Sequence, residues 1–332
     1  MRPEGDITRG TTNPSRLRRV DRWITQAQQP VLHSRDRPLI VDLGFGASPV
    51  TTLELYRRAR AVAPDAEVTG LEIDPERVAS AGRRLAAARA SGQALPGLSF
   101  ALGGFELPTE RRPALVRAFN VLRQYPEERA WAAWARLRSG LAPGGVLVEG
   151  TCDEVGRRAV WVTLPADGQR AALITFSARL ASLERPSDLA ERLPKALIHR
   201  NVPGEPVHQF LRDLDRAWDS AAPYSAFGFR QRWLAAVTSV SADWPVIRRP
   251  PEGGHRRWRL GEVSLPWAAL APARLRYPAC PSSQVAMLRA RVGIGSEPWS
   301  RTAAWKSGSE NAGPSRCLAS SRSRSISSLP VR

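Results

Sequence analysis

Short apolar runs alternate with alanine- and arginine-rich segments between residue 38 and about residue 150. The apolar runs predict strands at 39–43, 67–72, 98–102, 114–119 and 145–150. The segments between them predict helices at about 49–62, 75–91 and 126–139. Strands that alternate with helices are joined by parallel crossovers, which leave helices on both faces of the sheet. We therefore expect an α/β fold with a doubly wound, Rossmann-like, mostly parallel sheet.

Residues at the helix ends support these assignments. Ser48 followed by Pro49 predicts an N-cap with proline at the first helical position. Asp74 before Pro75 predicts the same arrangement for the second helix. The third helix is expected to begin after Pro126 and to close at Gly140.

The flanking regions follow less regular patterns. Residues 16–28 place Leu17, Val20 and Trp23 at helical spacing within an otherwise polar segment. After residue 150, strands are expected at 159–164 and 172–180 around the turn at Asp167 and Gly168, with helices at 207–218 and 230–240 and a last strand at 258–267. We expect an arginine-rich N-terminal arm (1–37), a Rossmann-like domain (38–180), a mainly helical extension that could form a substrate pocket or lid (181–272), and a serine- and arginine-rich disordered tail (273–332).

The formal net charge of the 332-residue chain is +18, which raises the question of nucleic-acid binding. Of its 49 basic residues only Lys195 and Lys306 are lysines, and the excess charge gathers at the two ends, where solvated arms explain it. Nucleic acid is therefore an open partner but not the favoured one. The sequence has no apolar run of spanning length and no secretory signal, and its three cysteines are far apart. We expect a cytoplasmic protein that neither enters the membrane nor binds a metal.

The residues after the first predicted strand carry the main chemical signal. Gly44-Phe45-Gly46 lies between that strand and a helix, where a turn without side chains lets a ligand approach the backbone. The second strand ends at Glu72, whose carboxylate suits the two hydroxyls of a ribose. Pro49 replaces a glycine of the dinucleotide fingerprint, and the P-loop lysine is absent. These features favour an adenosine ligand without phosphates.

Three motifs resemble those of class I S-adenosylmethionine-dependent methyltransferases across residues 38–151: Asp42-Leu43-Gly44-Phe45-Gly46, Gly70-Leu71-Glu72 and Leu141 to Val148. The resemblance implies that the cofactor is S-adenosyl-L-methionine, that Asp42 and the two glycines surround its methionine part, and that Glu72 holds its ribose. Members often carry an acid for the adenine amine where this chain has Gly104, so backbone groups and Phe105 are expected to serve there. Phe45 and Asn120 complete the expected cofactor residues.

The loop after the fourth strand begins with Asn120, but valine and leucine follow it where an amine methylase of nucleic acid or protein glutamine has prolines. That substrate class is therefore not supported. Methyl transfer from a sulfonium mainly requires alignment of an in-line attack, so no catalytic base is assigned. His199 and His208 are interpreted as ordinary loop residues, and Cys152 as a small buried side chain. Candidate substrate residues at the strand ends are Arg123, Tyr125, Glu149 and Asp153.

We therefore expect a methyltransferase that acts on an unidentified, small acceptor. Two alternatives stay open: a nucleic-acid-binding or RNA-modifying protein that uses its basic termini, and a catalytically inactive cofactor-binding module. The residues leave the methyl acceptor and the oligomeric state undetermined.

Overall fold

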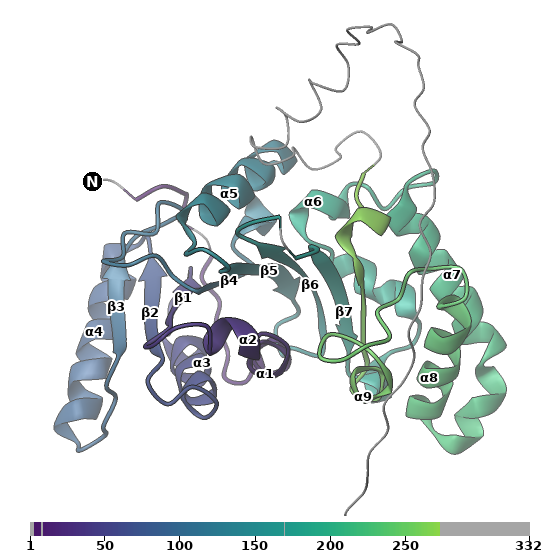
Figure 1. Ribbon diagram of the computed structural model, residues 1–332, viewed down its shortest axis with the longest axis horizontal. Coiled ribbons are helices and arrows are strands. Elements are labelled where there is room, and N and C mark those ends of the chain that lie inside the picture. The colour runs from purple at the N-terminus through teal and green to yellow at the C-terminus, as the bar shows by residue number, and fades with distance from the viewer. Residues whose placement is uncertain (1–2, 8, 169, 273–332) are drawn as a thin grey trace, which may run out of the picture. The chain divides into compact units, whose positions relative to one another are not determined.

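One eight-stranded sheet organises the computed structural model, which describes residues 3–7, 9–168 and 170–272. The strand order is β3-β2-β1-β4-β5-β6-β7-β8 (Figure 1). The first five strands pair in parallel, and β6, β7 and β8 add to β5 as antiparallel neighbours. The strands are β1 (Leu39–Leu43), β2 (Glu67–Glu72), β3 (Leu98–Leu102), β4 (Leu115–Phe119), β5 (Val146–Cys152), β6 (Arg158–Pro165), β7 (Leu173–Ala178) and β8 (Glu262–Pro266). The predicted α/β class and mostly parallel sheet are confirmed.

Helices cover both faces of this sheet. They are α1 (Arg18–Ala27), α2 (Gln29–Leu32), α3 (Val50–Arg60), α4 (Pro75–Ala90), α5 (Glu127–Gly140), α6 (Lys195–Ile198), α7 (Pro206–Ser220), α8 (Phe229–Val240) and α9 (His255–Trp258). Short 3-10 helices lie at Leu122–Gln124, Leu180–Ser182, Pro186–Arg192, Ala222–Phe227 and Trp267–Ala269. Residues 273–332, for which a disordered tail was predicted, lie outside the described residues.

Alternate residues of the central strands enter two separate cores. Ile40 and Leu115 pack with α1 and α3 on one face, whereas Val41 and Val116 pack with α5, α7 and α8 on the other. Strands β1, β4 and β5 are buried along their whole length, because both faces are covered. This explains why their sequences are mainly apolar rather than alternating, with Asp42, Arg117 and Glu149 as buried charged exceptions. On α5, Trp134 and Leu137 are buried in the core, and Trp131 is partly buried against it.

Two helix starts show how reliable the local signals were. Asp74 caps α4 as predicted, because its carboxylate accepts the backbone N–H groups of Glu76 and Arg77. The predicted cap at Ser48 is wrong. Helix α3 begins at Val50 after Pro49 without a side-chain cap, and the Ser48 hydroxyl instead accepts a hydrogen bond from Arg84 at 3.4 Å. The proline therefore occupies the capping position itself.

The start of the chain is packed onto the sheet rather than solvated. Helix α1 lies where its predicted spacing placed it, and its Trp23 and Ile24 are fully buried against the α3 face. This differs from the expectation that the N-terminal charge sits on a solvated arm. The arginines of α1 lie on its other side, while its apolar stripe extends the core.

At the other end of the sheet, residues 181–272 form helices that return to the sheet as a strand. Helices α7 and α8 pack on each other beyond β7 (Figure 1). Strand β8 then pairs with β7, where Ser177 lies opposite Glu262. The last strand is thus shorter than the predicted 258–267, because residues 255–258 form α9 and residues 267–269 form a 3-10 helix.

Candidate cofactor cleft

The Gly44-Phe45-Gly46 turn follows β1 and is held against the end of β2. Gly44 and Gly46 have positive φ angles of 71° and 78°, a region that favours glycine. The Gly44 N–H donates to the carbonyl of Leu71 at 2.7 Å, and the Gly46 N–H donates to Glu72 Oε2 at 2.8 Å. A side chain at Gly44 would meet Val121 at 2.7 Å. The turn therefore fits only without side chains at both positions.

Glu72 lies at the end of β2 and is almost fully buried. Its Oε1 atom accepts the N–H of Ile73 at 3.0 Å, and Arg77 lies 3.7 Å from the same atom. In the described part of the chain, its Oε2 atom accepts one hydrogen bond, from the Gly46 N–H. A carboxylate oxygen has two acceptor positions, so Oε2 keeps one for a ligand hydroxyl.

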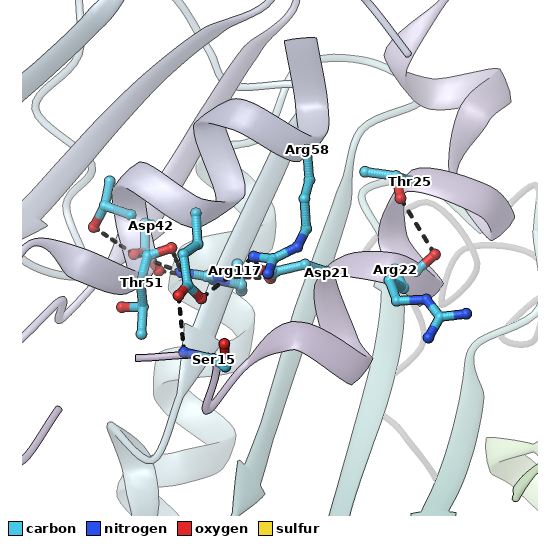
Figure 2. A network of polar contacts seen from close by, with 10 residues as sticks. Ser15, Asp21, Arg22, Thr25, Asp42, Thr51, Arg58 and Arg117 are labelled. Atoms are coloured by element: carbon cyan, nitrogen blue, oxygen red, sulfur yellow. Dashed lines mark hydrogen bonds and ion pairs between the residues drawn. The ribbon is translucent and has the colours of Figure 1, made fainter. Parts of the chain in front are cut away.

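Asp42, the first residue of the motif, has its charge neutralised from within the sheet. Arg117 of β4 donates to it from Nε at 2.9 Å and pairs with it from Nη2 at 2.7 Å, and the Thr52 hydroxyl donates at 2.7 Å. Figure 2 shows Arg117 between Asp42 and Asp21 of α1. Burial opposes the Arg117 charge, but the two carboxylates outweigh it and raise the arginine pKa.

Asp21 brings α1 into the same network. It pairs with Arg117, and Arg58 of α3 reaches it from the other side at 2.8 Å (Figure 2). Burial raises the pKa of the Asp21 carboxyl to about 6, against the opposing effect of the two guanidinium groups. At neutral pH, two acids and two arginines therefore join α1, α3, β1 and β4 directly behind the glycine turn.

Two openings lie on either side of the glycine turn, and Gly44 lines both. The first is lined by Asp42, Phe45, Gly46 and Asn120. The second, which is smaller, is lined by Glu72, Gly104, Phe105 and Tyr125. The structure thus brings together all eight predicted cofactor residues and one predicted substrate residue, Tyr125, at the carboxyl ends of the strands.

The N-terminal segment, residues 4–7 and 9–12, covers this cleft. The Glu4 carbonyl accepts the Phe105 N–H at 3.0 Å, and the Gly10 carbonyl accepts the Ala47 N–H at 2.9 Å. The Thr12 hydroxyl donates to the Phe45 carbonyl at 3.0 Å. A side chain at Gly104 would meet the Glu4 carbonyl at 2.0 Å. Gly104 therefore supplies room for the covering segment, and its N–H donates to the Glu106 carboxylate at 2.9 Å.

Asn120 ends β4 in an unusual backbone conformation. Its φ is +59°, which asparagine tolerates better than most residues. Its side-chain oxygen accepts the Cys152 N–H at 3.0 Å, and its amide nitrogen donates to Cys152 Sγ at 3.3 Å. Burial raises the pKa of the Cys152 thiol. The cysteine is thus a buried neutral group, as predicted, that holds Asn120 at the edge of the cleft.

Three predicted substrate residues have structural partners elsewhere and line neither opening. Arg123 donates to the carbonyl of Glu191 at 2.8 Å. The Asp153 carboxylate accepts the N–H groups of Arg157 and Arg158 in the turn between β5 and β6. Glu149 is a buried residue of β5, and its Oε2 accepts the Trp134 indole N–H of α5 at 3.1 Å.

Glu149 is chemically unusual because no counter-ion accompanies it among the described residues. Its Oε1 atom is buried without a hydrogen-bond partner there. Burial raises the pKa of Glu149 to about 8, and only the Trp134 hydrogen bond opposes the shift. The side chain is therefore protonated at neutral pH and belongs to the core.

Sequence reasoning missed Arg117 and the covering segment. An arginine within the apolar strand Leu115–Phe119 is a signal in itself, because a buried guanidinium requires acidic partners. Residues 4–12 carry no apolar pattern that could have indicated their position. Arg9, Arg16 and Gln124 also line the larger opening.

Other chemistry that the sequence raised lies away from the cleft. His199 contacts Lys195 at 3.0 Å, and His208 contacts Asn201 at 3.3 Å. Within residues 3–7, 9–168 and 170–272, no group of three or more histidine, cysteine, aspartate or glutamate side chains is arranged to hold a metal ion. No helix in the described part of the chain is long and apolar enough to cross a membrane.

No family model matches the chain. It is 32% identical over 181 residues to trans-aconitate 2-methyltransferase of Methylobacterium radiotolerans, a match that covers 53% of this chain and 63% of the relative. The chain thus spans less than two thirds of the curated relative that it matches.

Similar solved structures include magnesium protoporphyrin IX methyltransferase of Synechocystis PCC 6803 with bound SAH, at 20% identity and a TM-score of 0.31 over 42% of this chain and 55% of that chain. Human N-acetylserotonin methyltransferase in complex with SAM has 22% identity and a TM-score of 0.29 over 41% of this chain and 35% of that chain. Together, the strand order, the glycine turn, the acid at the end of β2 and the curated relative show that this chain has the class I S-adenosylmethionine-dependent methyltransferase fold.

Proposed function

We propose that the chain transfers a methyl group from S-adenosyl-L-methionine to a small acceptor. The observation that carries this proposal is the hydrogen bond between Glu72 and the Gly46 N–H, which fixes a ribose-binding acid beside a turn without side chains. The cleft is divided by that turn into two openings, one for each half of an elongated ligand. The similarity to a trans-aconitate methyltransferase supports a small acceptor.

The residues present fit this cofactor. Glu72 retains an acceptor position for a ribose hydroxyl, and Phe105 offers a ring surface in the same opening as Gly104 for the adenine. Asp42, Gly44, Phe45, Gly46 and Asn120 line the opening proposed for the methionine part. When bound, the cofactor supplies a methyl group already activated by its positive sulfur, so the protein needs mainly to orient the acceptor.

The chain's own contribution is alignment and exclusion of water. We place the acceptor beside Asn120, where Arg9, Arg16 and Gln124 line the same opening. The N-terminal segment closes the front of the cleft through Glu4, Gly10 and Thr12. We further propose that Tyr125 forms part of the entrance and that the extension 181–272 contributes to the acceptor side.

Calorimetric titration tests the cofactor. We expect S-adenosylmethionine and S-adenosylhomocysteine to bind with micromolar dissociation constants, and NAD not to bind. In Glu72→Ala, loss of the hydrogen bonds to the ribose should weaken binding by about 10- to 150-fold. The matched control is Glu76→Ala, because Glu76 is an exposed acid four residues away at the start of α4. Equal affinities of all three proteins would contradict the proposed role of Glu72.

Turnover requires a separate measurement. Formation of S-adenosylhomocysteine should depend on an added pool of small carboxylates and phenols, and it should be lost in Glu72→Ala. Tight cofactor binding without product from any acceptor pool would instead identify the inactive cofactor-binding module.

A further inference from the structure

A second cleft, rich in arginine, lies along the same edge of the sheet beyond β5. The pairing of the strands places the cleft there. Cys152 of β5 lies opposite Ala159 of β6, and Arg158 of β6 lies opposite Ala178 of β7. Ser177 of β7 lies opposite Glu262 of β8. The β5–β6 turn, the end of β7 and the start of β8 therefore meet at the edge where the cofactor cleft opens. We call this the arginine cleft.

Seven arginines line this cleft in two connected openings. One opening, of about 960 Å³, is lined by Arg18, Arg19, Arg157 and Arg179. The other, of about 1110 Å³, has Arg18, Arg19 and Arg179 in its wall as well, and adds Arg22, Arg230 and Arg259. The shared arginines make the two openings one continuous positively charged surface.

None of these arginines forms a direct ion pair in the described part of the chain. Every ion pair found there involves other residues. The one acid of the cleft, Glu262, is buried and pairs with Arg257 at 3.2 Å, and its charge also attracts Arg19 and Arg22. Burial lowers the pKa of Arg19, Glu262 opposes this shift, and the positive charges of Arg18, Arg22 and Arg179 add to it. An anion bound here would relieve that repulsion.

Backbone contacts hold part of the cluster in place. Arg19 donates to the Leu260 carbonyl at 2.9 Å, and Arg230 donates to the Arg259 carbonyl at 3.1 Å. Arg18, Arg22 and Arg179 keep their guanidinium groups exposed. Because guanidinium binds phosphate and carboxylate through two parallel hydrogen bonds, the cluster suits a ligand with more than one anionic group.

Two exposed aromatic rings add a second element of recognition. Phe227 and Phe229 line the larger opening and are 77% and 51% exposed. They flank Gly228, whose φ of +94° makes the sharp turn between the Ala222–Phe227 3-10 helix and α8. Exposed rings beside arginines favour a flat aromatic group, which can stack on the rings while its anionic groups contact the guanidiniums.

We propose that the arginine cleft binds a ligand that carries at least two phosphate groups beside a flat ring, the chemistry of a nucleoside diphosphate. The same chemistry is offered by a free nucleotide and by a single-stranded oligonucleotide. The inference goes beyond the proposed methyl transfer, because it concerns a different set of residues and holds whether or not the protein methylates anything.

Calorimetric titration with UDP, uridine and pyrophosphate tests the inference. UDP is used because its uracil base should not compete for a site that binds adenine. An excess of S-adenosylhomocysteine should therefore leave the dissociation constant of UDP unchanged. We expect UDP to bind, pyrophosphate to bind at least fivefold more weakly, and uridine to give no heat. Binding should weaken as the salt concentration rises, because charges are neutralised.

Substitutions locate the site. The double variant Arg22→Ala/Arg179→Ala should bind UDP at least tenfold more weakly, and Phe227→Ala should reduce the advantage of UDP over pyrophosphate. All three side chains are exposed, so the variants should keep the unfolding temperature of the parent protein. The matched control is Arg212→Ala, an exposed arginine of α7 outside both openings, which should bind UDP normally.

A parallel titration with decauridylate distinguishes a free nucleotide from a single-stranded oligonucleotide as the ligand. Tighter binding of decauridylate than of UDP, lost in the same double variant, identifies a strand; binding of UDP alone identifies a free nucleotide. Absence of UDP binding, equal loss in Arg212→Ala, or displacement of UDP by S-adenosylhomocysteine would each overturn the inference.

Discussion

Glu149 shows how a single buried acid should govern the pH dependence of stability. Its pKa is about 8 in the folded protein and near 4.5 in an unfolded chain, because burial disfavours its charge. Between these values the unfolded chain ionises while the folded protein keeps the proton. The free energy of unfolding should therefore fall as pH rises from about 4.5 to about 8, by at most about 5 kcal/mol.

Substitution of Glu149 by glutamine tests this expectation. The amide keeps the shape of the carboxylic acid and can still accept the Trp134 N–H, but it does not ionise. We expect Glu149→Gln to be more stable than the parent at pH 9 and similar to it at pH 5, as measured by urea unfolding. Glu76→Gln, at an exposed site, is the control. A parent-like fall in stability with pH in Glu149→Gln would exclude this residue as the cause.

Gly46 combines a backbone requirement with a steric one. Its φ is +78°, and a Cβ atom there would lie 2.6 Å from the Gly10 carbonyl oxygen. We expect Gly46→Ala to destabilise the fold by about 1–3 kcal/mol and to weaken S-adenosylhomocysteine binding. In contrast, Gly82 lies in helix α4 with nothing near its Cβ position, so Gly82→Ala should be stabilising by about 0.5–1 kcal/mol. Chemical unfolding of both variants measures whether the free energy of unfolding falls in Gly46→Ala and rises in Gly82→Ala.

At the level of elements, Arg117 joins α1 to the central strands. Its guanidinium pairs with Asp21 of α1 and Asp42 of β1, and all three side chains are buried. Removing one partner of a buried ion pair leaves uncompensated charge. We therefore expect Arg117→Met to lower the free energy of unfolding by about 3–5 kcal/mol, measured by denaturant unfolding.

The control for Arg117→Met is a change of the same kind at Arg112, an exposed residue shortly before β4. Arg112→Met should leave stability within about 0.5 kcal/mol of the parent. If Arg117→Met were equally mild, the network would contribute little to the attachment of α1.

The elements differ in how well their sequences predicted them. Strands 39–43, 67–72 and 98–102 were predicted with the bounds that the structure has, because each is a short, largely apolar run between helical or turn segments. Burial was not required, since β3 lies at the sheet edge and is mostly not buried. The cap at Ser48 failed because a serine at a helix start can turn its hydroxyl elsewhere, here toward Arg84. A local sequence pattern therefore indicates which hydrogen bonds a side chain is able to form. The residues that surround it in the folded chain determine which of these bonds forms.

At the scale of the whole molecule, the candidate cofactor cleft is built from distant parts of the chain. Residues near positions 5, 44, 72, 104 and 125 line one opening. A ligand bound there contacts several elements at once and should stabilise the whole fold. At one hundred times its dissociation constant, S-adenosylhomocysteine should add about 2.7 kcal/mol and raise the unfolding temperature by about 5–10 °C. Thermal unfolding with NAD should show no shift, and equal shifts with both compounds would argue against the proposed specificity.

The sequence by itself determined the fold class, because periodicity and turn chemistry are local properties. It also indicated the glycine turn and Glu72, and its resemblance to class I methyltransferases implied the other proposed cofactor residues. It did not indicate that Arg123, Glu149 and Asp153 would contact backbone and core instead of the cleft. Nor did it indicate that residues 4–7 and 9–12 cover the glycine turn, or that arginines of α1 and α8 gather with Arg157, Arg179 and Arg259 in one cleft. Several of these features depend on contacts between distant parts of the chain, such as Glu4 with Phe105 and Arg19 with Leu260, which only the packed chain brings together.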